Sequence, residues 1–283
     1  MMNLTSPSQV KAWCIENDFH PNKVLGQNFL IDRNQLVAIV DAGLEGVGGG
    51  EGGAGGEGEG EGGGVRVLEI GPGLGVLTEE LLNRGCKVTA IEKDPVLAAR
   101  LKESLGNPEG LAVVAADALD YLSRPSRPPF DCMVSNLPYQ AGTRILLELV
   151  MQREIPAMTA LVQMEVAERL AACEGSKTRS LAGVWAQLDY DVKIVRKVAA
   201  NCFWPRPEIG SAVVRLVRHS RNVALSAEER DVFHRLTKKA FEHRRKQLGS
   251  IFKDMIQSTA RAEALSNEDW ITLTKGLMQN EDA

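Results

Sequence analysis

The residues whose types and spacing point most specifically to one kind of chemistry are Asn136-Leu137-Pro138-Tyr139. The exocyclic amine of a nucleobase is a poor nucleophile, because its lone pair is delocalised into the ring. The side-chain oxygen of Asn136 and a backbone carbonyl held rigid by Pro138 can accept both amine hydrogens and localise that lone pair toward a methyl donor. Tyr139 offers a ring for an extruded base, and such stacking contributes roughly 1 to 3 kcal/mol. The pattern predicts amine chemistry on a nucleobase without a metal or a strong base, and a plain surface turn is the alternative.

A glycine loop is the second candidate site. Residues 65–75 read Val-Arg-Val-Leu-Glu-Ile-Gly-Pro-Gly-Leu-Gly, which predicts a buried strand, a tight turn and a helix N-terminus. A dinucleotide fingerprint requires glycine at the first, third and sixth positions of the loop, and here the sixth position after Gly71 and Gly73 is Val76. The spacing therefore disfavours a pyrophosphate ligand and hydride transfer.

An acidic residue follows at the end of the next predicted strand. Residues 87–91 lead into Glu92, about twenty residues after the loop, where a carboxylate can accept both hydroxyls of a ribose. A ribose without a pyrophosphate favours S-adenosylmethionine as the ligand. An ordinary strand and turn with a solvated glutamate is the alternative.

The elements that must position these groups alternate as strands and helices. Strands are predicted at residues 65–70, 87–91, 111–115 and 130–135. In a parallel doubly wound sheet the carboxyl ends of the strands form one crevice, which would bring residues 69–75, Glu92, Asp117 and residues 136–139 together. Asp117 is expected to accept from the exocyclic amine of a cofactor adenine, unless it only caps the helix that follows.

Two further loops are candidates for this crevice. Gln27 and Asn28 stand in a glycine-containing turn and can offer polar side chains at the mouth of the sheet, although a surface turn is the favoured interpretation on the residues alone. Residues 192–198 and 212–217 form a predicted strand pair, joined by a proline-stiffened loop with two aromatics, of which Phe203 is one. Aromatics between basic residues can sandwich a base, and a buried hydrophobic loop is the alternative.

The C-terminal part of the chain is predicted to be a separate helical domain. Beyond residue 220 the apolar pattern is wholly helical, and Ser226 with Glu229 forms a capping box. The expected division is an α/β domain at residues 1–220 and an all-helical domain at residues 221–283.

The charge distribution favours a polyanionic partner. The formal net charge is −4, but residues 43–64 hold 14 glycines and five glutamates, and without those five acids the sum becomes +1. This tract cannot bury apolar surface and is expected to be disordered. Residues 193–221 carry seven Lys or Arg against Glu208, and residues 238–253 carry six against Glu242. A basic face fits a phosphate backbone, with solvated charges as the alternative.

The cysteine spacing and the apolar runs of the sequence bear on disulfides, metal sites and location. The five cysteines lack Cys-x-x-Cys spacing, so buried free thiols are expected rather than disulfides, and no metal site is predicted. The sequence has neither an apolar run of about 18 residues nor a secretory signal, so a cytoplasmic protein without a membrane partner is expected.

With these pieces in place, the chain resembles the ribosomal RNA adenine dimethyltransferase family of the KsgA (RsmA) type. The matching stretches are residues 25–30, 68–78, 91–94, 117–119, 136–139, 163–169, 203–216 and 241–248. The resemblance implies a Rossmann-like S-adenosylmethionine-dependent methyltransferase domain with a small C-terminal all-helical domain. Together with the crevice, it implies as cofactor-binding residues Gln27, Asn28, Leu30, Glu69, Gly71, Gly73, Gly75, Glu92, Lys93, Asp117, Ala118 and Asn136. The implied residues for the target adenine are Asn136, Leu137, Pro138, Tyr139 and Phe203.

The family dimethylates the exocyclic amines of two adjacent adenines in the 3′-terminal hairpin loop of small-subunit (16S) rRNA. The resemblance therefore implies small-subunit rRNA within a pre-30S particle as the partner, a role in small-subunit biogenesis, and a monomer that docks through residues 221–283. Two features depart from the family pattern. One is the acidic insert at residues 43–64, and the other is the segment 177–181, which lacks the Tyr-Gly usually found before its leucine.

Three alternatives remain open. A macrolide-resistance methyltransferase of large-subunit rRNA would have a similar glycine loop and adenine pocket, although residues 210–216 and the length of the C-terminal helices favour the small-subunit enzyme. A catalytically idle nucleic-acid-binding factor of the same fold would have no need to keep residues 136–139. A DNA adenine methyltransferase would usually carry Pro-Pro-Tyr where Leu137-Pro138-Tyr139 stands.

Overall fold

A seven-stranded sheet organises the α/β part of the described chain. The computed structural model describes residues 4–22, 25–48, 63–219 and 225–281. The strands lie in the order β4-β3-β2-β5-β6-β9-β7. Their bounds are β2 Arg66–Ile70, β3 Lys87–Glu92, β4 Leu111–Ala115, β5 Cys132–Asn136, β6 Ala157–Gln163, β7 Tyr190–Val198 and β9 Ser211–Arg218. Neighbours from β4 to β6 pair in parallel, and β9 runs antiparallel to β6. The expected mostly parallel, doubly wound fold is confirmed.

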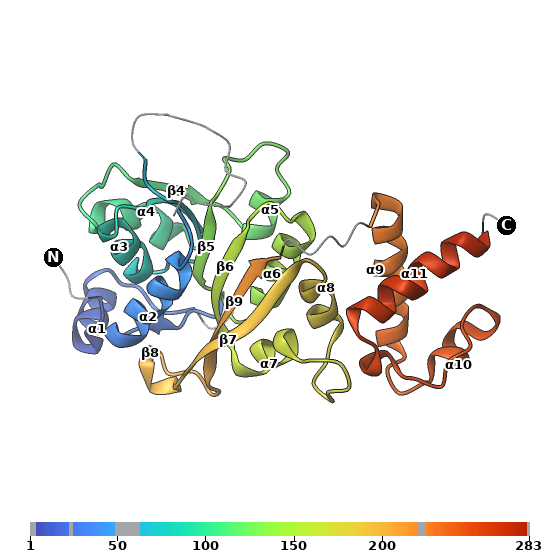
Figure 1. Ribbon diagram of the computed structural model, residues 1–283. Coiled ribbons are helices and arrows are strands. Elements are labelled where there is room, and N and C mark those ends of the chain that lie inside the picture. The colour runs from blue at the N-terminus through green and yellow to red at the C-terminus, as the bar shows by residue number, and fades with distance from the viewer. Residues whose placement is uncertain (1–3, 23–24, 49–62, 220–224, 282–283) are drawn as a thin grey trace. The chain divides into compact units, whose positions relative to one another are not determined.

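Helices cover both faces of this sheet (Figure 1). On one face lie α2 (Arg33–Leu44), α3 (Val76–Asn83) and α4 (Pro95–Ser104). On the other lie α5 (Ala118–Leu122), which is the helix that Asp117 was expected to cap, and α6 (Gly142–Gln152), which the sequence pattern had not indicated. Because the sheet is covered on both sides, β5 and β6 are buried along nearly their whole length instead of alternating between core and solvent.

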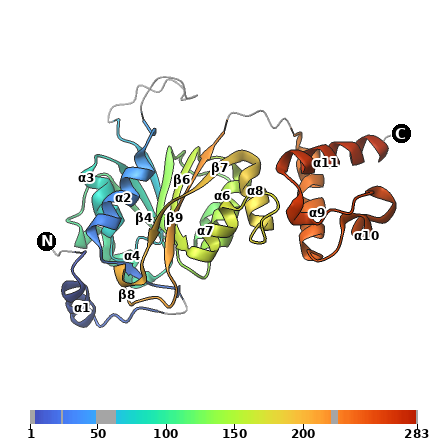
Figure 2. The ribbon, with the colours of Figure 1, turned by 60° about the horizontal axis from the view of Figure 1, so that its bottom comes forward.

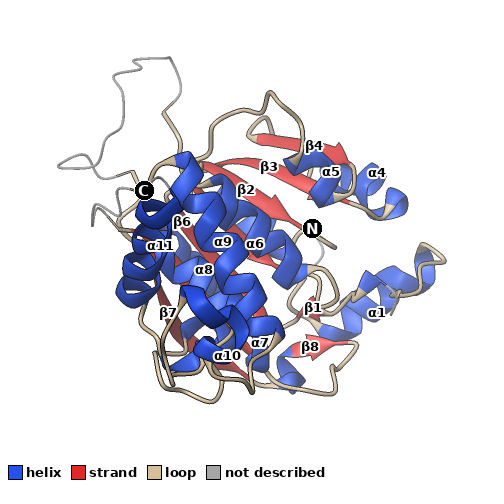
Figure 3. Cartoon of the chain, turned by 90° about the vertical axis from the view of Figure 1, so that its right-hand side faces the viewer, coloured by secondary structure: helices blue, strands red, loops and turns tan. Residues whose placement is uncertain are grey.

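The N-terminal segment adds a small second sheet. After α1 (Pro7–Glu16), the strand β1 (Phe29–Leu30) pairs antiparallel with β8 (Phe203–Trp204), apart from the main sheet (Figure 3). The side chain of Asp32 then caps α2 by accepting from the N–H of Gln35 at 3.0 Å. The pairing brings the N-terminal turn and the aromatic loop together, although they are distant in sequence.

The chain divides into two compact units. The first comprises Met1–Ala167 and Lys193–Val217, and the second comprises Glu168–Val192 and Arg218–Ala283. The expected boundary at 220–221 lies outside the described residues, and the segment Glu168–Val192 groups with the C-terminal helices rather than with the sheet. Its helix α8 explains this grouping, because Val184 and Leu188 are buried in the same apolar cluster as Phe233 and Trp270.

The helices of the second unit surround that cluster. They are α8 (Leu181–Asp189), α9 (Ala227–Glu242), α10 (Leu248–Phe252) and α11 (Asn267–Glu281), together with the last part of α7 (Met164–Ala171). The helix α11 packs against α9 (Figure 2). Ser226 and Glu229 form the predicted capping box at the start of α9. Over the described residues, none of the helices is both long and apolar enough to cross a membrane.

The glycine- and glutamate-rich tract begins later than expected. Gly43 is buried within α2, and Leu44 and Val47 pack against the core of the first unit, so the prediction of disorder from residue 43 onward is wrong for these residues. The cause is close helix packing, since a Cβ added to Gly43 would stand 2.4 Å from Cγ2 of Val134 in β5. Residues 49–62 of the tract lie outside the described residues.

The cysteines are free thiols in different environments. Cys14, Cys86, Cys132 and Cys202 are buried, as expected. Cys173 is exposed, so the expectation of a buried thiol is wrong there, because this residue lies in the turn that follows α7.

Candidate active site

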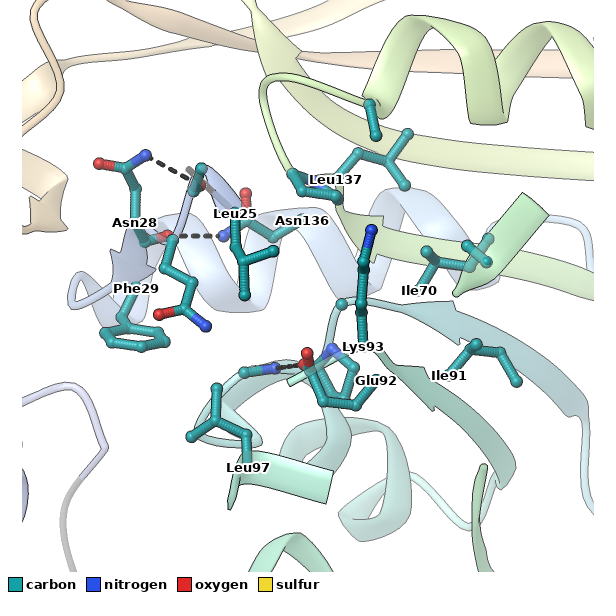
Figure 4. Close-up of a pocket in the computed structure, with 18 of the residues that line it drawn as sticks. Leu25, Asn28, Phe29, Ile70, Ile91, Glu92, Lys93, Leu97, Asn136 and Leu137 are labelled. Atoms are coloured by element: carbon teal, nitrogen blue, oxygen red, sulfur yellow. Dashed lines mark hydrogen bonds between the residues drawn. The ribbon is translucent and has the colours of Figure 1, made fainter. Parts of the chain in front are cut away.

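A pocket opens at the carboxyl ends of the parallel strands β2, β3, β4 and β5 (Figure 4). Its volume is about 330 Å³, within the roughly 300 to 1,000 Å³ of small-ligand sites. The predicted residues that line it are Gln27, Asn28, Leu30, Gly71, Gly73, Glu92, Lys93, Asp117, Ala118, Asn136, Leu137, Pro138 and Tyr139. The strand ends therefore converge as a parallel sheet requires, and the N-terminal turn completes the wall.

Two glycines let the loop after β2 turn tightly beside the pocket. The φ angles of Gly71 and Gly73 are +69° and +59°, in the left-handed region that favours glycine. A Cβ added to Gly71 would stand 3.4 Å from Cδ of Pro138 and 3.8 Å from the carbonyl oxygen of Asn136. The absence of a side chain at Gly71 thus keeps open the space between the glycine loop and the loop that follows β5.

Glu92 ends β3 with its carboxylate against the glycine loop. One carboxylate oxygen accepts from the backbone N–H of Gly73 at 3.1 Å, and the other accepts from that of Asp94 at 2.8 Å. Burial raises the pKa of this carboxyl group, while the two N–H donors oppose the rise. An ionised carboxylate has about four acceptor sites, so Glu92 keeps the capacity to accept from a pair of ligand hydroxyls.

Asn136 is oriented by the N-terminal turn. Its Nδ2 donates to the backbone carbonyl of Asn28 at 3.0 Å (Figure 4). Since this bond occupies the nitrogen branch of the amide, the oxygen branch is the acceptor that Asn136 presents on its other side. The side chain of Asn28 itself donates to the carbonyl of Gly26 at 3.1 Å, so Asn28 contributes its backbone rather than its amide to this contact.

Tyr139 and Phe203 lie together, but only Tyr139 reaches the pocket. Their ring centroids are 6.5 Å apart with an interplanar angle of 71°, which is an edge-to-face contact. Phe203 is 2% exposed and lies outside the pocket lining. The hydroxyl of Tyr139 lies 2.5 Å from that of Ser211. The structure therefore brings the two predicted aromatics into contact without placing an open slot between their faces.

Asp117 caps a helix and also lies in the pocket wall. It caps α5 by accepting from the N–H of Leu119 at 2.8 Å, and it lines the pocket. Its other carboxylate oxygen lies 2.8 Å from Nζ of Lys93, and this hydrogen bond holds the pKa of Asp117 below its usual range. The carboxylate is thus ionised and fixed at the pocket wall.

Gln27 ties the N-terminal turn to the loop after β3. Its Nε2 donates to the carboxylate of Asp94 at 2.9 Å. Asp94 also caps α4 by accepting from the N–H of Val96 at 2.9 Å. Asp94 was not predicted as a site residue, although an aspartate directly before Pro95 is a recognisable helix start.

Glu69 and Gly75 were predicted to bind the ligand, but they lie outside the pocket lining. Glu69 is 1% exposed and accepts from Oγ1 of Thr78 at 2.7 Å, and burial raises the pKa of its carboxyl group to about 8. Gly75 begins α3 with a φ of +91°, and a Cβ there would stand 2.6 Å from Cδ1 of Leu101. Glu69 is tied to α3 through Thr78, and Gly75 lets the start of α3 approach Leu101 of α4, so neither residue forms the pocket surface.

Comparison with known proteins assigns the chain to a family. The family model described as "Ribosomal RNA adenine dimethylase" matches residues 18–278. The chain belongs to this family. This adenine dimethylase therefore uses S-adenosylmethionine to methylate adenines of ribosomal RNA, as the resemblance implied.

Curated relatives of the dimethylase share the name "Ribosomal RNA small subunit methyltransferase A". The protein of Deinococcus radiodurans is 41% identical over 213 residues, which are 75% of this chain and 67% of that protein. The protein of Moorella thermoacetica is 36% identical over 88% of this chain and 84% of its own. The protein of Protochlamydia amoebophila is 32% identical over 99% of both chains.

Solved structures agree with this fold. The 23S rRNA methyltransferase ErmE has a TM-score of 0.65 and 25% identity, with 89% of this chain and 100% of that chain covered. A dimethyladenosine transferase from Plasmodium falciparum also has a TM-score of 0.65, with 23% identity over 76% of this chain and 90% of that one.

The pocket of the dimethylase has the chemistry that S-adenosylmethionine requires. Glu92 is a buried carboxylate with acceptor capacity, which suits a ribose diol. A Cβ at Gly71 would narrow the pocket beside the carbonyl oxygen of Asn136. A cofactor that reaches from the end of β3 toward Asn136 would therefore meet a hydroxyl acceptor at one end and the backbone carbonyl of Asn136 at the other.

Proposed function

We propose that this dimethylase acts on the exocyclic amines of two adjacent adenines in the 3′-terminal hairpin loop of small-subunit (16S) rRNA. Its relatives named for the small subunit are 32 to 41% identical, against 25% for the large-subunit enzyme ErmE. That difference supports the small subunit over the large-subunit alternative.

The cofactor site in this proposal uses residues from all four strand ends. Glu92 accepts from the ribose hydroxyls, and Asp117 accepts from the adenine amine beside Lys93. The backbone of Gly71 borders the rest of the cofactor, and the turn that carries Asn28 closes the pocket from the N-terminal side. When bound, S-adenosylmethionine supplies an electrophilic methyl on a sulfonium, and its transfer leaves the neutral thioether and releases one proton from the amine.

The observation that carries the proposed mechanism is the hydrogen bond from Nδ2 of Asn136 to the carbonyl of Asn28, at 3.0 Å. With the amide nitrogen committed to that carbonyl, Oδ1 can accept one hydrogen of the target amine. A backbone carbonyl of the same loop accepts the second, so the nitrogen lone pair is no longer shared with the ring. Acceleration then comes from positioning, and no side chain has to act as a strong base.

Tyr139 serves as the stacking surface for the extruded adenine, with Leu137 and Pro138 holding the loop that carries it. Pro138 fixes the turn, since its carbonyl accepts from the N–H of Gly142 at 2.7 Å at the start of α6. Phe203 would have to move from its buried position to stack on the same base.

The setting in this proposal is the cytoplasm, where the protein works as a monomer on a pre-30S particle during small-subunit biogenesis. The C-terminal helices dock on the rRNA. Exposed cations of α9 and the following turn, Lys238, Lys239, Arg245 and Lys246, support a role in holding phosphates.

The test is methyl transfer from labelled S-adenosylmethionine to three purified substrates in parallel: unmethylated small subunits, large subunits and free rRNA. The RNA is then digested, and the modified nucleosides are identified by mass spectrometry. We expect dimethyladenosine from small-subunit substrates alone. Label in large-subunit RNA would favour the macrolide-resistance activity instead, and no transfer to any substrate would make the protein a binding factor that has kept the fold.

A further inference from the structure

Tyr139 is constrained from three directions. Its backbone N lies 3.1 Å from the position of a Cβ on Gly26, so the N-terminal turn approaches the backbone of Tyr139 closely. The edge of its ring meets Phe203. Its hydroxyl lies 2.5 Å from Oγ of Ser211. Of these three contacts, only the last fixes the far end of the side chain.

Ser211 is a rigid partner for that hydroxyl. It is the first residue of β9, it pairs with Gln163 of β6, and it is fully buried at 0% exposure. The carbonyl of Gly210, the residue before Ser211, accepts from the N–H of Met164 at 3.0 Å. The backbone just before Ser211 is therefore also fixed to the end of β6. A hydroxyl attached to such a strand has little freedom to move.

We propose that Ser211 is a positioning residue for the target adenine, acting through Tyr139. The inference rests on the proposed function, in which the Tyr139 ring receives the extruded base. A hydrogen bond at the tip of a tyrosine fixes where the ring lies before the base arrives, because χ1 sets the position of the phenolic oxygen, and the edge-to-face contact with Phe203 limits rotation of the ring about χ2. Ser211 therefore sets the position of the ring on which the base stacks, and so sets where the amine of that base lies relative to Asn136.

The same bond links the two loops that handle the base. Tyr139 belongs to the loop after β5, whereas Ser211 directly follows the loop that carries Phe203. If Phe203 shifts when a base enters, the hydrogen bond between the two hydroxyls keeps the Tyr139 side chain in place at the start of β9. Burial also raises the pKa of the Tyr139 hydroxyl, so the phenol keeps its proton and remains able to donate near neutral pH.

A double-mutant cycle tests this inference. Ser211→Ala and Tyr139→Phe each remove the same hydrogen bond from one side, and each should lower kcat about fivefold to tenfold, the scale of one net hydrogen bond. The double variant should be no slower than either single variant, because the bond can be lost only once. The affinity for S-adenosylmethionine, measured by calorimetry, should not change, since neither hydroxyl belongs to the proposed cofactor contacts.

The matched control is Thr159→Val, which removes a different buried hydroxyl from the same sheet. Thr159 is 1% exposed on β6, and its Oγ1 contacts the carbonyl of Ala42 at 3.5 Å, away from Tyr139. Its kcat should equal that of the parent. A comparable fall in kcat for Thr159→Val would show that any loss of a buried hydroxyl slows the enzyme, and would overturn the positioning role.

Two other outcomes would also overturn the inference. In one, the parent is active and the two substitutions lower kcat independently, so that the fold reductions of the single variants multiply in the double variant. The other is a Tyr139→Phe variant as fast as the parent, which decides the matter even if Ser211→Ala fails to fold. A parent inactive on every ribosomal substrate would remove the proposed function and this inference together, whereas the first two results would leave the proposed function intact.

Discussion

At Asn136, one hydrogen bond decides which atom of the amide can receive the target amine. Asn136→Ala removes Oδ1 and should lower kcat on the order of 100-fold, as loss of one preorganised polar contact to a reacting group does. The affinity for small-subunit rRNA should be retained, because the helical domain and its cations are unchanged. Single-turnover methylation with a parallel filter-binding assay measures both quantities. A variant that methylates as fast as the parent would show that the lone-pair argument is wrong.

Glu69 gives a prediction about pH. Burial raises its pKa from 4.5 to about 8, so between these values the folded protein holds a proton that the unfolded chain releases. The free energy of unfolding contributed by this group is therefore largest below about pH 4.5 and falls as the pH rises toward about 8. Glu69→Gln cannot ionise, and its amide oxygen can still accept from Thr78.

Thermal unfolding of the two proteins at several pH values measures this effect. Between about pH 5 and pH 8 the Tm of the parent should fall more than that of Glu69→Gln, because only the parent must retain a buried proton. Equal changes in Tm across this range would mean that Glu69 is not the group responsible.

At the scale of elements, the approach of α2 to the sheet depends on Gly43. Gly43→Ala should lower the stability of the protein by roughly 1 to 3 kcal/mol, because its Cβ would overlap the buried side chain of Val134 and overpacking costs about that much. Gly276→Ala in α11 is the matched control, since no atom lies within 4 Å of the added Cβ. That variant should be more stable by up to about 1 kcal/mol, from helix propensity alone.

Thermal and urea unfolding, followed by circular dichroism, compare these two variants. A Gly43→Ala variant as stable as Gly276→Ala would mean that α2 can shift away from β5 without loss. Such a result would show that the close approach of Gly43 to Val134 does not contribute to the stability of the protein.

At the scale of the whole molecule, the net charge is negative while the proposed partner is a polyanion. Binding must then depend on where the cations lie rather than on their sum. Arg245→Ala and Lys246→Ala, in the turn after α9, should each weaken binding to small subunits and reduce the slope of log K against log salt by about one. Neither should alter the affinity for S-adenosylmethionine.

Lys102→Ala provides the charge-matched control for that comparison. This lysine is exposed in the last turn of α4, in the other unit of the chain. Its loss should leave the salt dependence of rRNA binding as in the parent. If all three variants weaken binding equally, the attraction would be a general effect of net charge and not a docking surface on the helical domain.

Much of the fold follows from local sequence signals. The strands that end in Glu92 and Asn136 were predicted to within two residues at either end, because buried parallel strands are short apolar runs. The cap at Ser226 was predicted because a capping side chain bonds to a backbone N–H only three residues away. The pocket was also predicted, since parallel strands must end at one edge.

Contacts between distant parts of the chain were decided only by the tertiary structure. Asn136 and Asn28 are 108 residues apart in the sequence, and Tyr139 and Ser211 are 72 residues apart, so no local sequence pattern predicts either hydrogen bond. The same holds for Phe203, whose aromatic character suggested stacking on a base while the β1–β8 pairing buries it. Sequence by itself determined the family, the four strands whose ends form the pocket, and the residue types at the site. The packing of the elements decided which atoms of those residues face the ligand, because that depends on the whole path of the chain.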